Sequence, residues 1–216
     1  MASDTDNIEK TGRQTWYRLL NWTVHVELAK AHFQDVVRQK ANENYFEALY
    51  VNHDDGERQI QLFAGAHPVG RPQTVWDSRG RIKSQRLYVE KGAALVMSQS
   101  IRGEVAVILY PYQSERHRRR EDFLVWGVFD DPAEITTSRL QRMTKDFFTY
   151  VRTSSLYFTP SVSDNLRIEW LLFLSRRYDE QGVWRFIFTH PLLLAVGILG
   201  SIASIWGLIL AFKGAN

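Results

Sequence analysis

The feature that most constrains this chain is an uncharged apolar stretch near its C-terminus. No Asp, Glu, Lys or Arg lies between Arg185 and Lys213, and Leu192–Phe212 is a run of 21 mostly apolar residues. A helix needs about 20 apolar residues to cross the hydrocarbon core of a bilayer, and a water-soluble helix of that length normally carries a charged face. We therefore expect residues 186–212 to form a single transmembrane helix. A buried hairpin or a subunit-interface helix is the alternative.

Basic residues flank this stretch unequally, which predicts its orientation. Arg176, Arg177 and Arg185 precede it, whereas Lys213 follows it. Positively charged flanks stay on the cytoplasmic side of a membrane. The sequence therefore predicts a tail-anchored protein of the inner (plasma) membrane, with the lipid bilayer as a partner and the N-terminal domain in the cytoplasm.

Small residues gather on one side of the predicted membrane helix, which has about 3.6 residues per turn. This small face consists of Gly197, Gly200, Ser201, Ser204, Gly207 and Ala211. Such faces let helices approach closely in lipid. We expect the chain to assemble with itself through this face, as a homo-oligomer of four or more subunits whose helices could line a pore. A passive tether is the alternative, because glycine is frequent in membrane helices in any case.

The residues before this stretch have the composition of a folded domain. Hydrophobic residues make up 44% of the chain and charged residues 24%, which is sufficient for a core. Residues 1–13 are polar without apolar periodicity, so we expect a flexible N-terminus followed by one cytoplasmic domain over residues 14–182. The sequence contains no cysteine, which excludes disulfides and thiolate chemistry.

Hydrophobic periodicity predicts an α+β fold for this domain. Helical spacing of apolar residues is expected to give helices at 14–41, 136–152 and 163–178. Alternating patterns predict an antiparallel sheet of five to six strands, flanked by helices, from 45–52, 59–64, 85–90, 93–99, 104–110 and 123–129. Residues 65–80 hold two prolines and three glycines and are expected to form a loop. In the last helix, four residues share a face and are expected to point into the core: Leu166, Trp170, Phe173 and Leu174.

The sequence carries no recognisable catalytic motif. Serine-hydrolase, Walker A, zinc-protease and dinucleotide-binding signatures are all absent from it. His25 and His32 could share a helix face but lack further metal ligands nearby, so we expect neither a metal nor a cofactor. We do not expect an enzyme. Glu90, Glu104 and His117 are the residues to test if the chain is a hydrolase or nuclease after all.

Two groups of basic residues are candidate anion-binding sites. The first group, between two predicted strands, is Arg116, Arg118, Arg119 and Arg120, and the second, on the approach to the membrane, is Arg167, Arg176, Arg177 and Arg185. Arginine binds phosphate through paired N–H groups, and repetition around an oligomer axis would create a positive vestibule. We expect a nucleotide or oligonucleotide ligand there. For the first group, a solvated hairpin tip or contact with anionic headgroups is the alternative.

The stretches VEKGAALVMSQSIRGEVAVILYPYQSE (Val89–Glu115) and LRIEWLLFLSRR (Leu166–Arg177) resemble a family of small bacterial proteins. The layout of the chain, a small α+β domain before a short membrane segment, resembles the membrane effectors of bacterial antiphage systems, in particular the Hailong-type effector. The resemblance implies a homo-oligomeric ion channel that is gated by an oligonucleotide made by a partner nucleotidyltransferase. It rests on the layout alone and assigns no binding residue. The alternative function is a membrane-anchored adaptor or scaffold.

Overall fold

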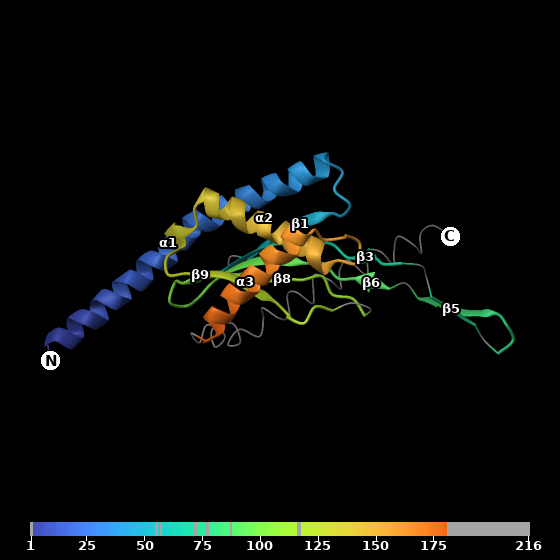
Figure 1. Cartoon of the computed structure of the whole chain (residues 1–216). Coiled ribbons are helices and arrows are strands. Elements are labelled where there is room, and N and C mark those ends of the chain that lie inside the picture. Colours follow the sequence, from blue (N-terminus) through green and yellow to red (C-terminus); the bar gives the residue numbers. More distant parts are fainter. Residues whose placement is uncertain are drawn as a thin grey trace.

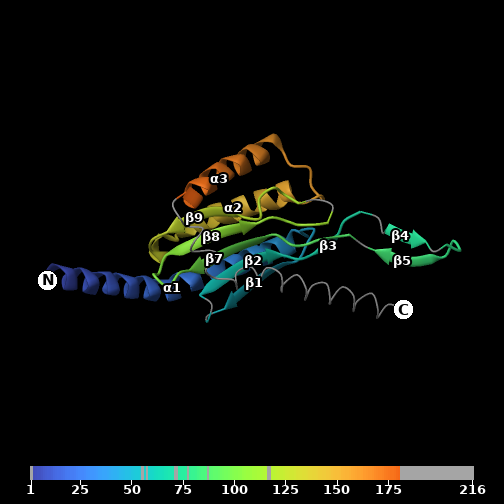
Figure 2. The ribbon, with the colours of Figure 1, turned by 90° about the horizontal axis from the view of Figure 1, so that it is seen from below.

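The computed structural model describes residues 2–54, 56, 58–70, 73–76, 78–86, 88–115 and 118–180. These residues form an antiparallel five-stranded sheet with two helices against one face and a third helix along one edge (Figures 1 and 2). The predicted α+β fold with its antiparallel sheet is confirmed. Within the described ranges no helix is long and apolar enough to span a membrane. The predicted transmembrane helix, residues 186–212, lies outside those ranges.

The main sheet has the strand order β1–β2–β7–β8–β9. Its strands are β1 (Leu49–Asp54), β2 (Gln59–Ala64), β7 (Ala94–Gln99), β8 (Val105–Tyr110) and β9 (Leu124–Phe129). In the register, Ile60 lies opposite Met97, and Met97 lies opposite Val107. These three side chains are fully buried and point to the same face of the sheet, so the period-two pattern of the sequence sets the register.

The segment between β2 and β7 is more ordered than the predicted loop over residues 65–80. β3 (His67–Pro68) pairs with β6 (Val89–Glu90), and β4 (Gln73–Trp76) pairs with β5 (Ile82–Arg86). The β4–β5 hairpin projects from one end of the domain (Figure 2). The expected single strand at 85–90 is therefore wrong, because its two ends belong to separate small sheets. Strands of two to five residues are too short for their periodicity to be recognised.

Helix α1 (Ala2–Asn42) is the longest element. It begins at Ala2, so residues 2–13, expected to be flexible, continue the helix. Its buried side consists of Trp22, Val26, Ala29 and Phe33, at helical spacing. The N-terminal part of α1 extends past the end of the sheet (Figure 1), which is why Trp16 remains 58% exposed although it continues the apolar pattern.

Helix α2 (Thr137–Ser154) packs beside α1 on the same face of the sheet. It follows a short 3₁₀ turn, η1 (Pro132–Glu134), and the Thr136 hydroxyl caps it by accepting from the Arg139 N–H. The fully buried side chains of α2 are Leu140, Met143, Phe147, Tyr150 and Val151. They join the side chains of α1 and the strands in one apolar core.

Helix α3 (Val162–Glu180) lies along β9, at the edge of the sheet, and against α2 (Figure 2). The predicted inward face of this helix is wrong, since Leu166, Trp170 and Phe173 are at least half exposed and Leu174 is only partly buried. Ile168, Leu171 and Ser175 are the buried residues. The helix packs on an edge strand rather than on the middle of a sheet, so only a narrow strip of its surface is covered.

Two polar contacts fix the rotation of α3. The Ser175 hydroxyl accepts from the Val125 N–H of β9 at 2.9 Å, which satisfies a donor on the edge strand. Arg167 donates two hydrogen bonds to Asp146 of α2, at 2.8 and 2.7 Å, and Trp126 Nε1 donates a third at 2.7 Å. Asp146 is 4% exposed. Turning α3 to bury its apolar side would break the bonds of Ser175 and Arg167.

We predict that Asp146→Ala destabilises the domain by about 2–3 kcal/mol, because Arg167 and the Trp126 indole lose their shared partner in a buried setting. Urea unfolding of the full chain measures this loss. Asp35→Ala is the matched control: Asp35 also pairs with an arginine, Arg38, but its side chain is 67% exposed. The control should change stability by less than about 0.5 kcal/mol. Equal effects of the two substitutions would contradict this assignment.

Candidate functional site

The arginines predicted from sequence have unequal surroundings. Arg167 is held by both oxygens of Asp146, and this contact raises the pKa of the guanidinium. The pair uses two of the N–H groups of the guanidinium, and the carboxylate compensates its positive charge. Arg167 is therefore part of the packing between α2 and α3.

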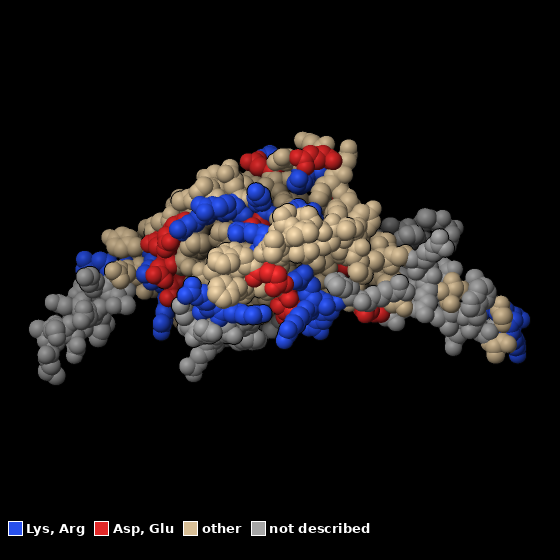
Figure 3. All heavy atoms as spheres, in the orientation of Figure 1, with Lys and Arg blue, Asp and Glu red and all other residues tan. Residues whose placement is uncertain are grey.

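The first basic group lies in the connection from β8 to β9, where acidic neighbours pair with two of its four arginines. Arg118 pairs with Asp122 at 2.5 Å. Arg119 pairs with Glu121, donates to the Thr153 carbonyl and lies over the Tyr150 ring. Figure 3 shows the same interleaving of basic and acidic side chains over the face that carries α2 and α3. This part of the surface is not a patch of one sign.

Of the arginines predicted as ligand contacts, three in the described part of the chain remain available to an anion. Arg120 lies in the β8–β9 connection, and Arg176 and Arg177 lie in the last turns of α3. All three are exposed and form no ion pair with the residues that the structure describes. Arg116 and Arg185 lie outside the described residues, as does the whole predicted small face, Gly197, Gly200, Ser201, Ser204, Gly207 and Ala211.

Glu90 and Glu104, two of the three residues named above as tests for a hydrolase, do not lie close together. Glu90 comes just before β7, and Glu104 follows the turn after β7, so they lie at opposite ends of that six-residue strand. Such a strand spans about 20 Å. His117 lies outside the described residues. Among the residues described, no cluster of three or more candidate ligands could hold a metal ion.

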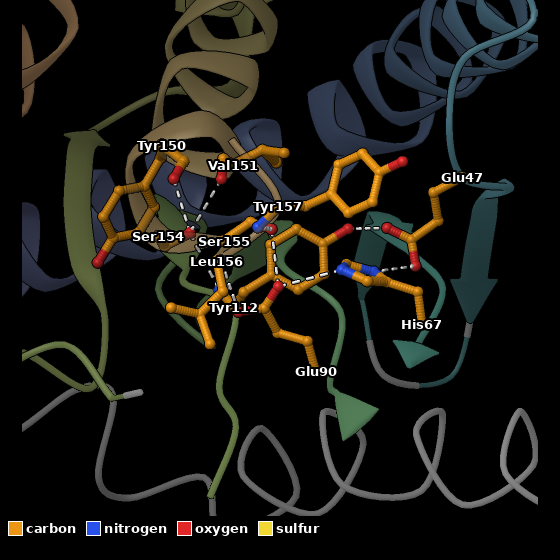
Figure 4. A network of polar contacts seen from close by, with 10 residues as sticks. All are labelled: Glu47, His67, Glu90, Tyr112, Tyr150, Val151, Ser154, Ser155, Leu156 and Tyr157. Carbon is orange, nitrogen blue, oxygen red and sulfur yellow. Dashed lines mark hydrogen bonds and ion pairs between the residues drawn. The ribbon is translucent and has the colours of Figure 1, made fainter. Parts of the chain in front are cut away.

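Glu90 instead belongs to a buried polar cluster that sequence reasoning missed (Figure 4). We call the residues Glu47, His67, Glu90 and Tyr112 the Glu–His–Glu cluster. Glu47 precedes β1, His67 is in β3, Glu90 is in β6, and Tyr112 follows β8. Four separate segments therefore meet at the end of the main sheet where the small β3–β6 sheet begins. No spacing motif reveals such a set, because its members are up to 65 residues apart.

The imidazole of His67 bridges the two carboxylates. Its Nδ1 lies 3.3 Å from Glu47 Oε1, and its Nε2 lies 3.1 Å from Glu90 Oε2. Tyr112 donates its hydroxyl proton to the other oxygen of Glu47. Side-chain exposure falls to 13% for His67, 5% for Glu47 and zero for Glu90.

The connection after α2 completes the cluster. The Ser155 hydroxyl donates to Glu90 at 2.7 Å, and the Leu156 N–H donates to the same carboxylate at 2.9 Å. Gly92, which follows Glu90 between β6 and β7, lets its own backbone approach the end of β2, because a Cβ there would lie 1.7 Å from the Ala64 carbonyl oxygen. Glu90 is thus fully buried and fully hydrogen-bonded, as a buried charge must be.

Burial and ion pairing act on the cluster in opposite directions. Burial alone lowers the pKa of His67, but its contacts with Glu47 and Glu90 outweigh it and raise the pKa to about 9. Burial alone raises the pKa of Glu90, but the bonds from His67, Ser155 and Leu156 together lower it. Burial raises the pKa of Glu47 overall. The imidazolium and the Glu90 carboxylate therefore form an ion pair at neutral pH.

This geometry defines what the cluster can do. A protonated His67 with both nitrogens engaged can neither accept a proton nor ligate a metal. Glu47 alone of the four lines a surface cavity of about 350 Å³, beside Lys40, Tyr45 and Phe46. The Phe46 and Tyr157 rings stack on each other and both contact the His67 ring edge to face. The Glu–His–Glu cluster therefore fits a structural role, in which ion pairs and hydrogen bonds hold four segments together, better than it fits a reactive centre.

Comparison with known proteins gives no further guide to the site. Neither protein-family models, nor curated proteins, nor solved structures match the chain.

We predict that the free energy of unfolding decreases as pH rises from about 6.5 to 9, because unfolding releases the proton of His67 over this range. Its folded pKa of about 9 exceeds the ordinary value of 6.5, so the stabilisation is complete below pH 6.5 and is lost as pH rises through 9. The difference corresponds to about 3 kcal/mol. Urea midpoints of wild type and His67→Gln across this range test it, and the variant should lack the decline.

His32→Gln is the control for this series. Burial lowers the pKa of His32, so its contribution has the opposite sign: it is present at high pH and is lost as pH falls. The control should keep the alkaline decline. If the urea midpoint of the wild type stays constant from pH 6.5 to 9, the ion pairing of His67 in the Glu–His–Glu cluster is excluded.

Proposed function

We propose that this chain is a homo-oligomeric membrane effector of the kind that bacterial defence systems use. In this proposal residues 186–212 enter the inner membrane and form an ion channel or pore. The α+β domain stays in the cytoplasm and gates it in response to a nucleotide or oligonucleotide. The observation that carries the proposal is the uncharged run Leu192–Phe212, attached to a folded domain by a short connection after α3.

Exposed apolar surface on the domain supports assembly. On α1, Tyr17, Leu20 and Val24 are 53%, 49% and 67% exposed and recur at helical spacing. On α3, Trp170 and Phe173 are each 53% exposed. Apolar surface of this kind on a folded domain is typical of protein or membrane contacts. Subunit contacts through these helices would act together with the predicted small face in the membrane.

The contacts of each arginine indicate which of them are best placed to bind the proposed ligand. Arg118, Arg119 and Arg167 already have acidic partners. Arg176 and Arg177 are exposed at the C-terminal end of α3, one short connection before the apolar stretch. Their position would couple ligand binding directly to the membrane segment. We therefore assign the ligand contact to this pair first, with Arg120 as a second contribution.

We expect Gly200→Leu/Ser204→Leu to abolish assembly and ion flux. Bulky side chains on the small face would keep the helices from approaching closely. Size-exclusion chromatography with light scattering in detergent measures the oligomer, and dye or ion release from liposomes measures the flux. Ile198→Leu/Ile202→Leu changes large apolar residues that lie outside the small face of the same predicted helix, so this control should retain both. A monomer that the small-face substitutions do not alter would favour the membrane-anchored adaptor.

We expect Arg176→Glu/Arg177→Glu to weaken binding of a short oligonucleotide at least tenfold. Replacing two cations by two anions removes the attraction for phosphate and adds repulsion. Fluorescence anisotropy with a labelled single-stranded oligonucleotide measures the affinity at two salt concentrations. Arg142→Glu/Lys145→Glu changes the charge equally on the exposed side of α2 and should have little effect. Equal losses in both variants would indicate a nonspecific charge effect and exclude this contact.

A further inference from the structure

The main sheet has a second apolar face, turned away from α1 and α2. We call it the outer face. Its apolar side chains form two small clusters separate from the main core: Phe63, Ala94, Val96, Ala106, Ile108, Tyr110, Phe123, Val125 and Val128. They alternate along the strands with the residues of the main core, so that Ile108 points out where Val107 and Leu109 point in.

The apolar residues of the outer face are densest over β7, β8 and β9, although Phe63 of β2 and Tyr50 of β1 also stack on this face. Toward β1 the outward residues become polar, with Gln59 and Gln61 on β2 and Asn52 on β1. Over β7, β8 and β9 they are almost all apolar. A sheet that is apolar on both faces needs a covering layer on both. From the helices of the described part, Tyr178 of α3 is the side chain that packs there.

The chain leaves α3 beside this surface. Tyr178 packs on the outer face and α3 ends at Glu180, so the following residues begin beside this apolar area. They include Leu192–Phe212, which has no charge. As a helix these 21 residues would be about 32 Å long. The three six-residue strands β7, β8 and β9 span about 10 Å across and 20 Å along, and a helix is about 10 Å in diameter, so one helix running along these strands would cover their apolar side chains.

We propose that, when it is not inserted in a bilayer, the segment 186–212 docks on the outer face of its own chain. A second copy seated there instead would cover two sheet faces and leave two apolar segments in water. Docking within one chain removes both apolar surfaces from water at once, with a single short connection. Docking and membrane insertion would use the same residues, so release of the segment from the sheet would be the regulated step. That consequence rests on the proposed function, which the inference deepens.

The absence of cysteine from the sequence makes a direct test possible. Val128→Cys and Phe63→Cys each place a single thiol at the margin of the outer face, where the native side chains are partly buried. Each full-length variant is purified without detergent, labelled with benzophenone maleimide and irradiated. Mass spectrometry then identifies the crosslinked peptides. Ser138→Cys, exposed on α2 in the opposite layer, is the matched control.

The proposal expects crosslinks from both outer-face positions to peptides within residues 186–212 of the same chain, and none from Ser138→Cys. Crosslinks to a second chain, or to no part of the segment, would overturn it. Repeating the irradiation with phosphatidylglycerol-containing vesicles separates the two proposals. If protein floats with the vesicles and the crosslinks disappear, docking and insertion compete as proposed. If the crosslinks persist and the protein never binds vesicles, docking stands and the membrane role fails.

Discussion

The central strands β7 and β8 require a cover on both sides, and most of the architecture follows from that requirement. Both strands are buried along nearly their whole length, which is common in two-sided sheets and unusual in an antiparallel sheet with one face in water. Helices α1 and α2 supply one cover through a continuous core. The other face is equally apolar over β7 to β9, and the uncharged C-terminal run is the part of the sequence with matching chemistry.

Buried charge is placed where separate segments must be joined. The Glu–His–Glu cluster holds the start of β1 and the small β3–β6 sheet at one end of the domain, and the Ser155 and Leu156 donors add the connection after α2. Asp146 does the same between α2, α3 and β9. Apolar packing tolerates sliding and rotation, whereas these directional bonds permit one arrangement. They explain why α3 leaves large apolar side chains exposed.

The sequence correctly predicts the elements whose residues follow a local hydrophobic period. It does not predict features that depend on contacts between residues far apart in the chain. Strands β2, β7, β8 and β9 and helix α2 lie within one or two residues of their predicted bounds, because each carries a full period of its pattern. The orientation of α3 could not be predicted, since its apolar residues suggest one buried side and its bonds to Asp146 and Val125 select another. Composition identifies the arginines, but Arg167 takes its acidic partner, Asp146, from another element. The contacts of His67 with Glu47 and Glu90 likewise come from other segments.

The unequal fixation of α3 bears on how a signal could reach the C-terminal segment. Its first half is fastened by Arg152 to Asp164 and by Arg167 to Asp146. Beyond Ser175 the described contacts of the helix reduce to the packing of Tyr178 on the outer face. The last turn carries the exposed Arg176 and Arg177. In the proposed function, an anion bound there would act where the chain leaves the sheet, so the same turn is suited both to hold the segment on the sheet and to release it.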